Sequence, residues 1–199
     1  FRILLITCLS YSVILWSCVM LFPRAFSSLF TPDTALLDFT APMLRIYFSG
    51  MISFKGVQRR FDIRYKDDKV CYIDDYAHHP EEILATLKAV RNLFPDKELT
   101  LVFQPHLYTR TRDFMNEFAE TLSLADRLLL MEIYPAREKA IPGITSSALL
   151  EKIMCKEKQI CQKEELLDVL KNIKPELIVT MGAGDIDRFV PQIETLLKS

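Results

Sequence analysis

The chain has 199 residues, of which 50% are hydrophobic, and its 25 basic and 26 acidic side chains give a formal net charge of −1. So balanced a charge excludes an overall electrostatic attraction to nucleic acid or to an acidic membrane surface as the basis of function. The charges are nevertheless unevenly distributed. Residues 1–54 carry only Arg2, Arg24, Asp33, Asp38 and Arg45, so this segment is predicted to differ in kind from the rest of the chain.

The segment 3–22 contains no charged side chain and is bracketed by Arg2 and Arg24. At 1.5 Å per residue, about twenty helical residues span about 30 Å, the thickness of the hydrocarbon core of a bilayer. A secretory signal has a shorter apolar core, and a buried soluble helix rarely stays apolar on every side over this length. We therefore interpret 3–22 as a transmembrane helix, with a signal or anchor segment and a buried helix as alternatives. Arginine on both flanks leaves its orientation open.

Residues 23–33 are predicted to form a loop, and residues 34–54 resume an apolar pattern that Asp38, Pro42 and Arg45 interrupt. Charges inside a membrane segment normally face other helices or water, so this second segment would require partner helices. The run from Leu21 to Ile52 resembles multidrug and toxic compound extrusion (MATE) transporters, at a loop and the helix after it. This resemblance implies a transporter fragment without a complete transport pathway. A two-helix hydrophobic anchor is the alternative.

Cysteine and histidine usage argues against disulfide and metal chemistry. The five cysteines, at positions 8, 18, 71, 155 and 161, form an odd set without a CxxC pair, which predicts reduced thiols in a cytoplasmic protein. The three histidines do not have HExxH spacing, so we predict no metal site.

Beyond residue 54 the chain alternates predicted strands and helices. The strands are expected at 61–65, 70–74, 99–104, 127–132 and 177–181, with a short one at 159–161. The helices are expected to begin at Pro80 and to cover 111–124, 145–154, 164–172 and 185–198. Strands followed by crossover helices predict an α/β domain of three layers with a mostly parallel sheet. The predicted domains are therefore residues 1–52, hydrophobic and helical, and residues 53–199.

Two short runs concentrate the polar residues of the second domain. The runs 72–80 and 103–112 contain all three histidines, and each begins as an apolar strand that turns abruptly polar. Ligands of open α/β sheets bind where strands end in this way, so we expect a site there. The run Gly182-Ala183-Gly184 after the last strand favours a tight turn over an anion site, and GxxxxGK[ST] does not occur, so the chain has no P-loop.

Five motifs in the second domain occur together and in order. They are FKGVQRRFD at 54–62, YIDDYAHHPEEI at 72–83, FQPHLYTRTRDF at 103–114, EIYPAREKAIPG at 132–143 and TMGAGDI at 180–186. This set resembles the C-terminal domain of the Mur ligase family of peptidoglycan synthesis. The resemblance covers residues 53–199 and implies a cytoplasmic, Rossmann-like domain that closes over a central ATPase domain.

The resemblance also implies an activity, the ATP-dependent joining of L-alanine to UDP-N-acetylmuramate with Mg²⁺. ATP would phosphorylate the carboxylate of the sugar nucleotide, and the amine of alanine would attack the acyl phosphate to form an amide. Such a reaction depends mainly on positioning, on charge stabilisation and on excluding water. Since the UDP-sugar and ATPase domains of the family do not occur in this chain, we expect it to be inactive alone.

Residue roles can be carried over where the motifs match. The family places nucleotide contacts at Arg60 and Asp75, so Arg60 would meet phosphate oxygens and Asp75 would accept from ribose hydroxyls. Tyr76, His78 and Arg110 fall where the family lines its alanine pocket.

Within that pocket, a guanidinium suits a bidentate grip on the carboxylate of alanine, and His78 is a plausible acceptor near the ammonium. His78 and Arg110 are therefore the catalytic candidates. His106 is a further pocket residue, and Leu107 follows it where many members of the family have Arg, which puts the contact set in doubt.

Structural roles compete with these functional ones. Asp74 and His79 are interpreted as caps of the helix that starts near Pro80. Arg59 and Arg112 are interpreted as members of surface ion pairs, which contribute about 0 to 1 kcal/mol.

For the whole chain, the first hypothesis is a ligase C-terminal domain joined near Ser53-Phe54 to a foreign transporter fragment. The alternatives are a component of a membrane transporter and a genuine fusion that tethers a binding module to the membrane.

Overall fold

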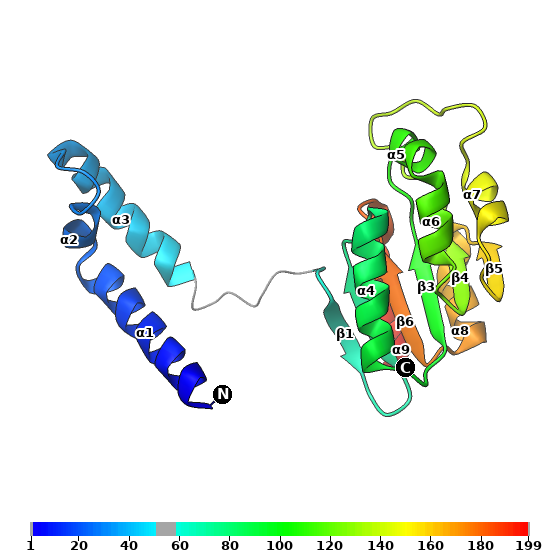
Figure 1. Cartoon of the computed structure of the whole chain (residues 1–199), viewed down its shortest axis with the longest axis horizontal. Coiled ribbons are helices and arrows are strands. Elements are labelled where there is room, and N and C mark those ends of the chain that lie inside the picture. The colour runs from blue at the N-terminus through cyan, green and yellow to red at the C-terminus, as the bar shows by residue number, and fades with distance from the viewer. Residues whose placement is uncertain (1, 51–58, 199) are drawn as a thin grey trace. The chain divides into compact units, whose positions relative to one another are not determined.

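The structure, a computed structural model, describes residues 2–50 and 59–198. The chain divides into two compact units, Phe1–Gly56 and Val57–Ser199 (Figure 1). The predicted junction at Ser53-Phe54 lies outside the described residues.

The first unit consists of α1 (Arg2–Leu21), α2 (Pro23–Ser27) and α3 (Thr34–Gly50). Helix α1 forms where a helix was predicted, whereas α2 lies in the predicted loop and begins with proline at a first helical position, which that residue favours. Arg45, one of the charged residues that interrupt the apolar pattern of α3, links α3 to α1. Arg45 donates to the carbonyls of Met20 and Leu21 at 3.1 and 3.5 Å, at the end of α1.

Among the helices of residues 2–50 and 59–198, none combines the length and the apolar character that are needed to cross a membrane. The predicted transmembrane helix at 3–22 is therefore not supported, although a helix does form there. Membrane contact through this segment and the transporter resemblance of residues 1–52 are likewise not supported.

The second unit is built on one six-stranded sheet in the order β1-β2-β6-β3-β4-β5. Strand β1 pairs antiparallel with β2, and all other neighbours are parallel, so the mostly parallel sheet is confirmed. The strands are β1 (Asp62–Lys66), β2 (Cys71–Asp75), β3 (Leu99–Phe103), β4 (Arg127–Leu130), β5 (Glu157–Ile160) and β6 (Leu177–Met181).

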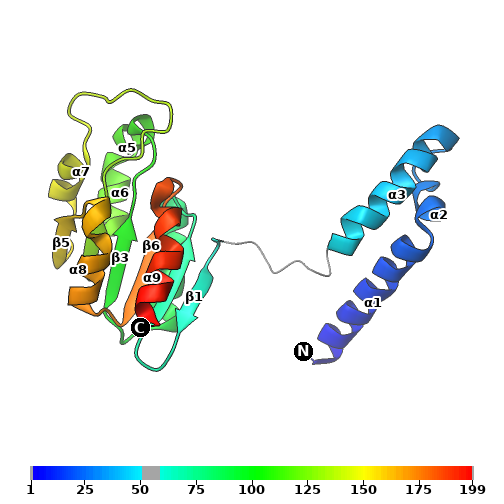
Figure 2. The same ribbon diagram turned by 180° about the vertical axis from the view of Figure 1, so that it is seen from behind.

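Helices cover both faces of this sheet, as Figures 1 and 2 show from opposite sides. Helices α4 and α6 cover one face, and α8 and α9 cover the other. The bounds are α4 (Pro80–Leu93), α5 (Tyr108–Asp113), α6 (Met115–Leu122), α7 (Ser146–Lys152), α8 (Leu166–Ile173) and α9 (Val190–Leu197), with 3-10 turns η2 (Lys163–Glu165) and η3 (Asp185–Phe189).

Successive side chains of the central strands point to opposite faces of the sheet, so the hydrophobic core has two parts, one on each face. On β3, Leu101 and Phe103 pack in the cluster that contains Leu87 of α4 and Phe118 of α6, whereas Val102 packs in the cluster that contains Leu170 of α8. Because both faces of the sheet are covered, the inner strands β3, β4 and β6 read as mainly apolar runs. The predicted three-layer α/β architecture is thereby confirmed.

Three predicted helices differ from those observed, the one at 164–172 only in that it begins as the 3-10 turn η2. The helix predicted over 111–124 is divided at Phe114, whose φ of −117° is not helical and whose ring packs edge-on against His79 at 4.6 Å between centroids. The predicted terminal helix at 185–198 begins as η3, and regular helix starts at Val190, directly before Pro191. Tertiary contact decides the first break, and the preference of proline for the first turn of a helix decides the second.

Candidate active site at the carboxyl edge of the sheet

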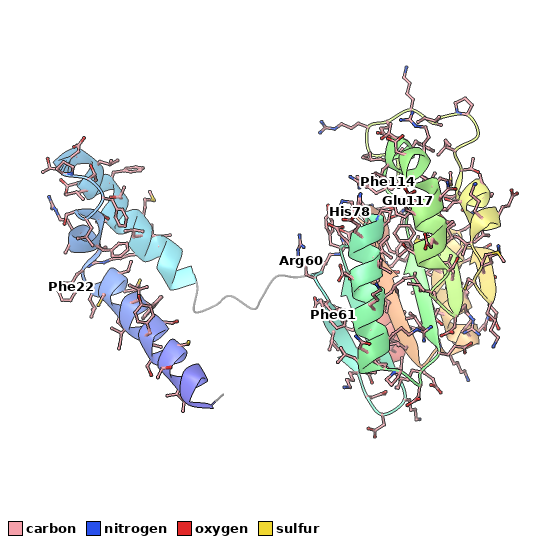
Figure 3. All side chains as sticks on the ribbon, viewed as in Figure 1. Phe22, Arg60, Phe61, His78, Phe114 and Glu117 are labelled. Atoms are coloured by element: carbon pink, nitrogen blue, oxygen red, sulfur yellow. The ribbon has the colours of Figure 1, made fainter. Side chains whose placement is uncertain are left out.

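The polar residues that follow β2, β3 and β6 meet at the carboxyl edge of the parallel sheet. Figure 3 labels Arg60, Phe61 and His78, which lie at this edge of the second unit. The site has two parts, an ion-pair network and pocket around the end of β2, and an imidazole and guanidinium cluster between the ends of β2 and β3.

A buried ion pair between Arg59 and Asp74 lies at the end of β2. The Asp74 carboxylate is fully buried and accepts from Arg59 Nε at 2.9 Å and from the Thr180 hydroxyl at 2.7 Å. A second nitrogen of Arg59, Nη2, donates to the carbonyl of Gly182 at 2.8 Å. Burial raises the pKa of Asp74, and the Thr180 hydroxyl and the Arg59 guanidinium oppose that rise. The interpretations of Asp74 as a helix cap and of Arg59 as a surface ion pair were therefore wrong, because their partners lie elsewhere in the sheet.

The neighbouring carboxylate, Asp75, holds three segments together. Its oxygens accept from the backbone N–H groups of Phe61 and Ala77 at 2.9 and 2.8 Å and from the Thr86 hydroxyl at 3.1 Å. Asp75 is 8% exposed, so most of its hydrogen-bonding capacity is spent inside the protein. These bonds attach the residues directly after Arg60 to β2 and α4.

Arg60 stands beside a pocket of about 310 Å³ at this edge. Its side chain is exposed and forms no ion pair with any residue that the structure describes. The pocket is lined by Arg60, Phe61, Asp75, Tyr76, Ala77, Glu82 and Thr86. The two predicted nucleotide contacts, Arg60 and Asp75, therefore line one cavity, and a free guanidinium there is suited to bind an anion.

The predicted alanine-pocket residues form a chain of ring contacts. Tyr76 and His78 lie edge to face with 5.0 Å between ring centroids, and His78 and His106 do so at 6.0 Å. His106 stacks on Tyr134 at 5.7 Å, and the Arg59 guanidinium lies 5.4 Å from the centroid of Tyr76. Rings from the segments that follow β2, β3 and β4 are thus brought into one cluster.

Two buried nitrogen atoms of this cluster lack a hydrogen-bond partner among the described residues. They are Nδ1 of His106 and Nη1 of Arg110. Buried polar groups normally form hydrogen bonds, so atoms without a partner require an explanation. One explanation is that they bind a ligand. Burial lowers the pKa of His106, with Arg110 and His78 acting in the same direction, so its ring favours the neutral form.

Helix α5 presents Arg110, and a residue that sequence reasoning missed holds that helix in place. The Glu138 carboxylate accepts from the Thr109 N–H at 3.0 Å and from the Thr109 hydroxyl at 2.5 Å. The hydroxyl bond is the main reason why the pKa of Glu138 is lowered. Glu138 lies in the EIYPAREKAIPG motif, but the spacing of that motif does not indicate its partner.

At the start of α4, His79 is the N-cap residue, as predicted, and forms a capping box with Glu82. The Glu82 carboxylate accepts from the N–H groups of His78 and His79 at 3.1 and 3.3 Å. The Nδ1 atom of His78 lies 3.0 Å from the Tyr76 carbonyl. Glu82 therefore fixes the backbone that carries His78. Arg112, by contrast, pairs at the surface with Asp113 at 2.8 Å, as predicted.

We expect the His106 ring to titrate below its ordinary pKa of 6.5 in an NMR pH titration of the imidazole signals. Because its folded pKa is depressed, its contribution to stability is present above about pH 6.5 and is lost as the pH falls towards the folded value. Arg110→Gln removes one of the causes and should move this pKa upward. Arg112→Gln, on the same helix, should leave it unchanged. A His106 pKa at or above 6.5 in the unsubstituted protein would contradict the assignment.

The turn after β6 is tightly packed, as predicted for Gly182-Ala183-Gly184. Gly182 has φ of +144°, and a Cβ atom there would lie 2.8 Å from the Gln104 carbonyl oxygen. We expect Gly182→Ala to lower the free energy of unfolding by about 2–4 kcal/mol, because strain and overpacking add. Gly143→Ala is the matched control, since Gly143 has φ of +80° but nothing within 4 Å of its added Cβ, and should cost about 1–2 kcal/mol. Urea denaturation measures both, and equal losses would contradict the packing argument.

No group of three or more His, Cys, Asp or Glu residues that could hold a metal occurs in residues 2–50 and 59–198. The acidic residues of the edge, Asp74 and Asp75, are committed to internal hydrogen bonds.

Comparisons with known proteins agree with this geometry. The family model "Mur ligase, glutamate ligase domain" matches residues 59–184. The UDP-N-acetylmuramate–L-alanine ligase of Phocaeicola vulgatus is 56% identical over 149 residues, which are 74% of this chain and 32% of that protein. The ligase of the same name from Cytophaga hutchinsonii is 51% identical over 170 residues, with 81% of this chain and 36% of that protein covered.

Among solved structures, the UDP-N-acetylmuramate-alanine ligase MurC from Thermotoga maritima matches with a TM-score of 0.58 and 24% sequence identity. The match covers 84% of this chain and 39% of that one, and at this identity it shows a shared fold. The chain spans about a third of the length of the curated relatives.

Proposed function

The chain belongs to the Mur ligase family, and we propose that its residues 53–199 are the C-terminal domain of an ATP-dependent ligase that joins L-alanine to UDP-N-acetylmuramate in peptidoglycan biosynthesis. One observation carries this proposal beyond the family match. Three groups suited to the chemistry lie along one edge of the sheet. They are the exposed Arg60 and the half-buried Arg110 and His106, each of which has one buried nitrogen without a partner among the described residues. We place this domain in the cytoplasm, with ATP, L-alanine and the sugar nucleotide as its small-molecule partners.

In this proposal, Arg110 binds the carboxylate of alanine. Its Nη1 atom is buried and has no hydrogen-bond partner among the described residues. A guanidinium can hold a carboxylate with two parallel hydrogen bonds. Tyr76 and the neutral ring of His106 complete the walls of the pocket. The depressed pKa of His106 means that this ring adds no positive charge to repel the ammonium group of alanine.

His78 is proposed as the group that accepts a proton near the alanine ammonium. Its Nδ1 faces the Tyr76 carbonyl at 3.0 Å, which leaves Nε2 as the ring nitrogen for a substrate. Glu82 lies 3.5 Å from Nδ1 and holds the backbone of His78. The ring is thus oriented by contacts from its own loop.

The nucleotide end of the site is proposed at Arg60 and Asp75. Arg60 would offset charge on phosphate oxygens, which suits a step in which charge passes to them. A carboxylate can accept about four hydrogen bonds, and Asp75 already accepts three, so a ribose hydroxyl would use its remaining capacity. Mg²⁺, which the family resemblance implies, is proposed to be held mainly by the ATPase domain.

A domain graft tests this function. The C-terminal third of the Phocaeicola vulgatus ligase is replaced by residues 57–199, and phosphate release is measured with ATP, UDP-N-acetylmuramate and L-alanine. We expect alanine-dependent phosphate release by the graft and none by this chain alone or by the truncated ligase. A folded graft without alanine-dependent release would overturn the proposal, and turnover by this chain alone would overturn the expectation that it is inactive.

A further inference from the structure

A second pocket, of about 630 Å³, lies at the end of the sheet opposite the candidate active site. Its residues precede three neighbouring parallel strands, with Lys69 and Val70 before β2, Lys97 before β3 and Glu176 before β6. The C-terminal ends of α8 and α9 complete its wall, at the lower end of the second unit in Figures 1 and 2. It shares no residue with the pocket beside Arg60.

The rim of this pocket is basic. Four lysines line it, Lys69, Lys97, Lys171 and Lys174, against two acidic residues, Asp68 and Glu176. Across the described ranges 2–50 and 59–198, no carboxylate lies within 4.0 Å of any of these four ammonium groups. The lining of the pocket therefore carries more positive than negative charge, and no ion pair within those ranges neutralises its lysines.

The floor of the pocket is apolar. Val70 and Leu170 are 8% and 2% exposed, Pro175 is buried, and Leu197 is partly exposed. A concave surface of this volume with an apolar lining and a few convergent charged groups has the character of a small-molecule site, for which volumes of about 300–1,000 Å³ are typical.

Helix dipoles explain part of this arrangement but not all of it. Helices α8 and α9 both end here, and cations such as Lys171 and Lys174 are favourable near the negative ends of helices. That effect can account for the positions of these lysines, and their substitution would then change the free energy of unfolding. It does not account for an apolar hollow between them.

We propose that this pocket binds a small organic anion with an apolar body, such as a medium-chain carboxylate or its phosphate analogue. The anionic group would lie among the lysine ammonium groups, and the apolar body would cover Leu170 and Leu197. Both the charge and the apolar body are required, because either feature alone would use only half of the site.

Octanoate is a suitable probe, with octylammonium as the matched probe of opposite charge and acetate as the probe without an apolar body. The full chain, labelled at its valine and leucine methyl groups, is titrated with each. We expect octanoate to shift the methyl signals of Val70, Leu170 and Leu197, with a Kd about tenfold lower than that of either other probe. The site-resolved readout separates this pocket from the exposed apolar side chains of the first unit.

Substitution of two rim lysines tests the role of charge. Lys97→Gln/Lys171→Gln should raise the Kd for octanoate about tenfold, while Lys88→Gln/Lys152→Gln, at lysines outside the pocket, should leave it within about twofold. Equal binding of octylammonium, unchanged affinity after the rim substitutions, or shifts confined to other methyl groups would each overturn the proposal. If the rim substitutions altered stability but not affinity, the lysines would serve the helix ends alone, and the proposal would again be overturned.

Discussion

Replacing Arg59 by methionine is expected to lower the free energy of unfolding by about 3–5 kcal/mol at neutral pH, among the largest effects of any single substitution in this chain. Methionine keeps much of the apolar stem but removes the guanidinium that pairs with Asp74 at 2.9 Å. The Asp74 side chain is fully buried, so its carboxylate would be left with the Thr180 hydroxyl as its remaining hydrogen-bond donor. Urea denaturation followed by the amide signals of β6 measures the loss.

The same substitution should make stability depend on pH in a defined direction. Burial already raises the pKa of Asp74, and removing Arg59 would raise it further. A carboxyl group with a raised folded pKa is stabilised in its protonated form, so the loss caused by Arg59→Met should be smallest in acid and should grow as the pH rises through the folded pKa. Asp74→Asn combined with Arg59→Met should recover much of the loss at neutral pH, because no charge is then buried.

Arg112→Met is the matched control for this prediction. Arg112 also pairs with an aspartate, at 2.8 Å, but both side chains are about half exposed. Exposed ion pairs contribute about 0 to 1 kcal/mol, so the control should change stability very little. Equal losses from the two substitutions would show that burial of Asp74 does not determine the strength of the network.

Arg110→Ala is expected to reduce kcat/KM for L-alanine by about 100-fold or more in the active domain graft, which corresponds to about 2.7 kcal/mol. The substitution removes the guanidinium that is proposed to bind the substrate carboxylate. The KM for ATP should change little, because Arg60 and not Arg110 lines the nucleotide pocket. Steady-state kinetics with alanine and ATP varied in turn measure both quantities.

Two further variants define the role of Arg110. Arg110→Lys should not restore full activity, because an ammonium group cannot form the two parallel bonds of a guanidinium. Arg112→Ala, at an exposed position of the same helix, should remain within about twofold of the unsubstituted graft. If Arg110→Ala raised the KM for ATP and left that for alanine unchanged, Arg110 would belong to the nucleotide end of the site.

Local sequence patterns were sufficient to locate most elements of the second unit. The strand predicted at 177–181 is β6 with the same bounds, and the helix predicted to begin at Pro80 is α4. Apolar runs and proline at a first helical position are properties of neighbouring residues, so they can be read without the fold. The same reasoning failed at α2, in the predicted loop at 23–33, where a short helix gives little periodicity to detect.

The structure brings the predicted site residues to one edge of the sheet, and their detailed contacts were not predicted. The ring contacts of Tyr76, His78 and His106 agree with the prediction that they share one pocket. The internal bonds of Asp75 and the clamp of Glu138 on Thr109 were not predicted, because their partners belong to other segments and follow no regular spacing. The functional roles of these residues remain proposals.

By itself, the sequence determined the α/β class, the positions of the strands and the family, since these depend on periodicity and on short motifs of adjacent residues. The tertiary structure alone decided how the ends of the strands are joined. Arg59 reaches Gly182 across 123 residues and turns Asp74 from an expected helix cap into a buried ion-pair partner. A buried charge is stabilised by whatever lies within hydrogen-bond distance in space, and for these residues that is set by the pairing of β2 with β6.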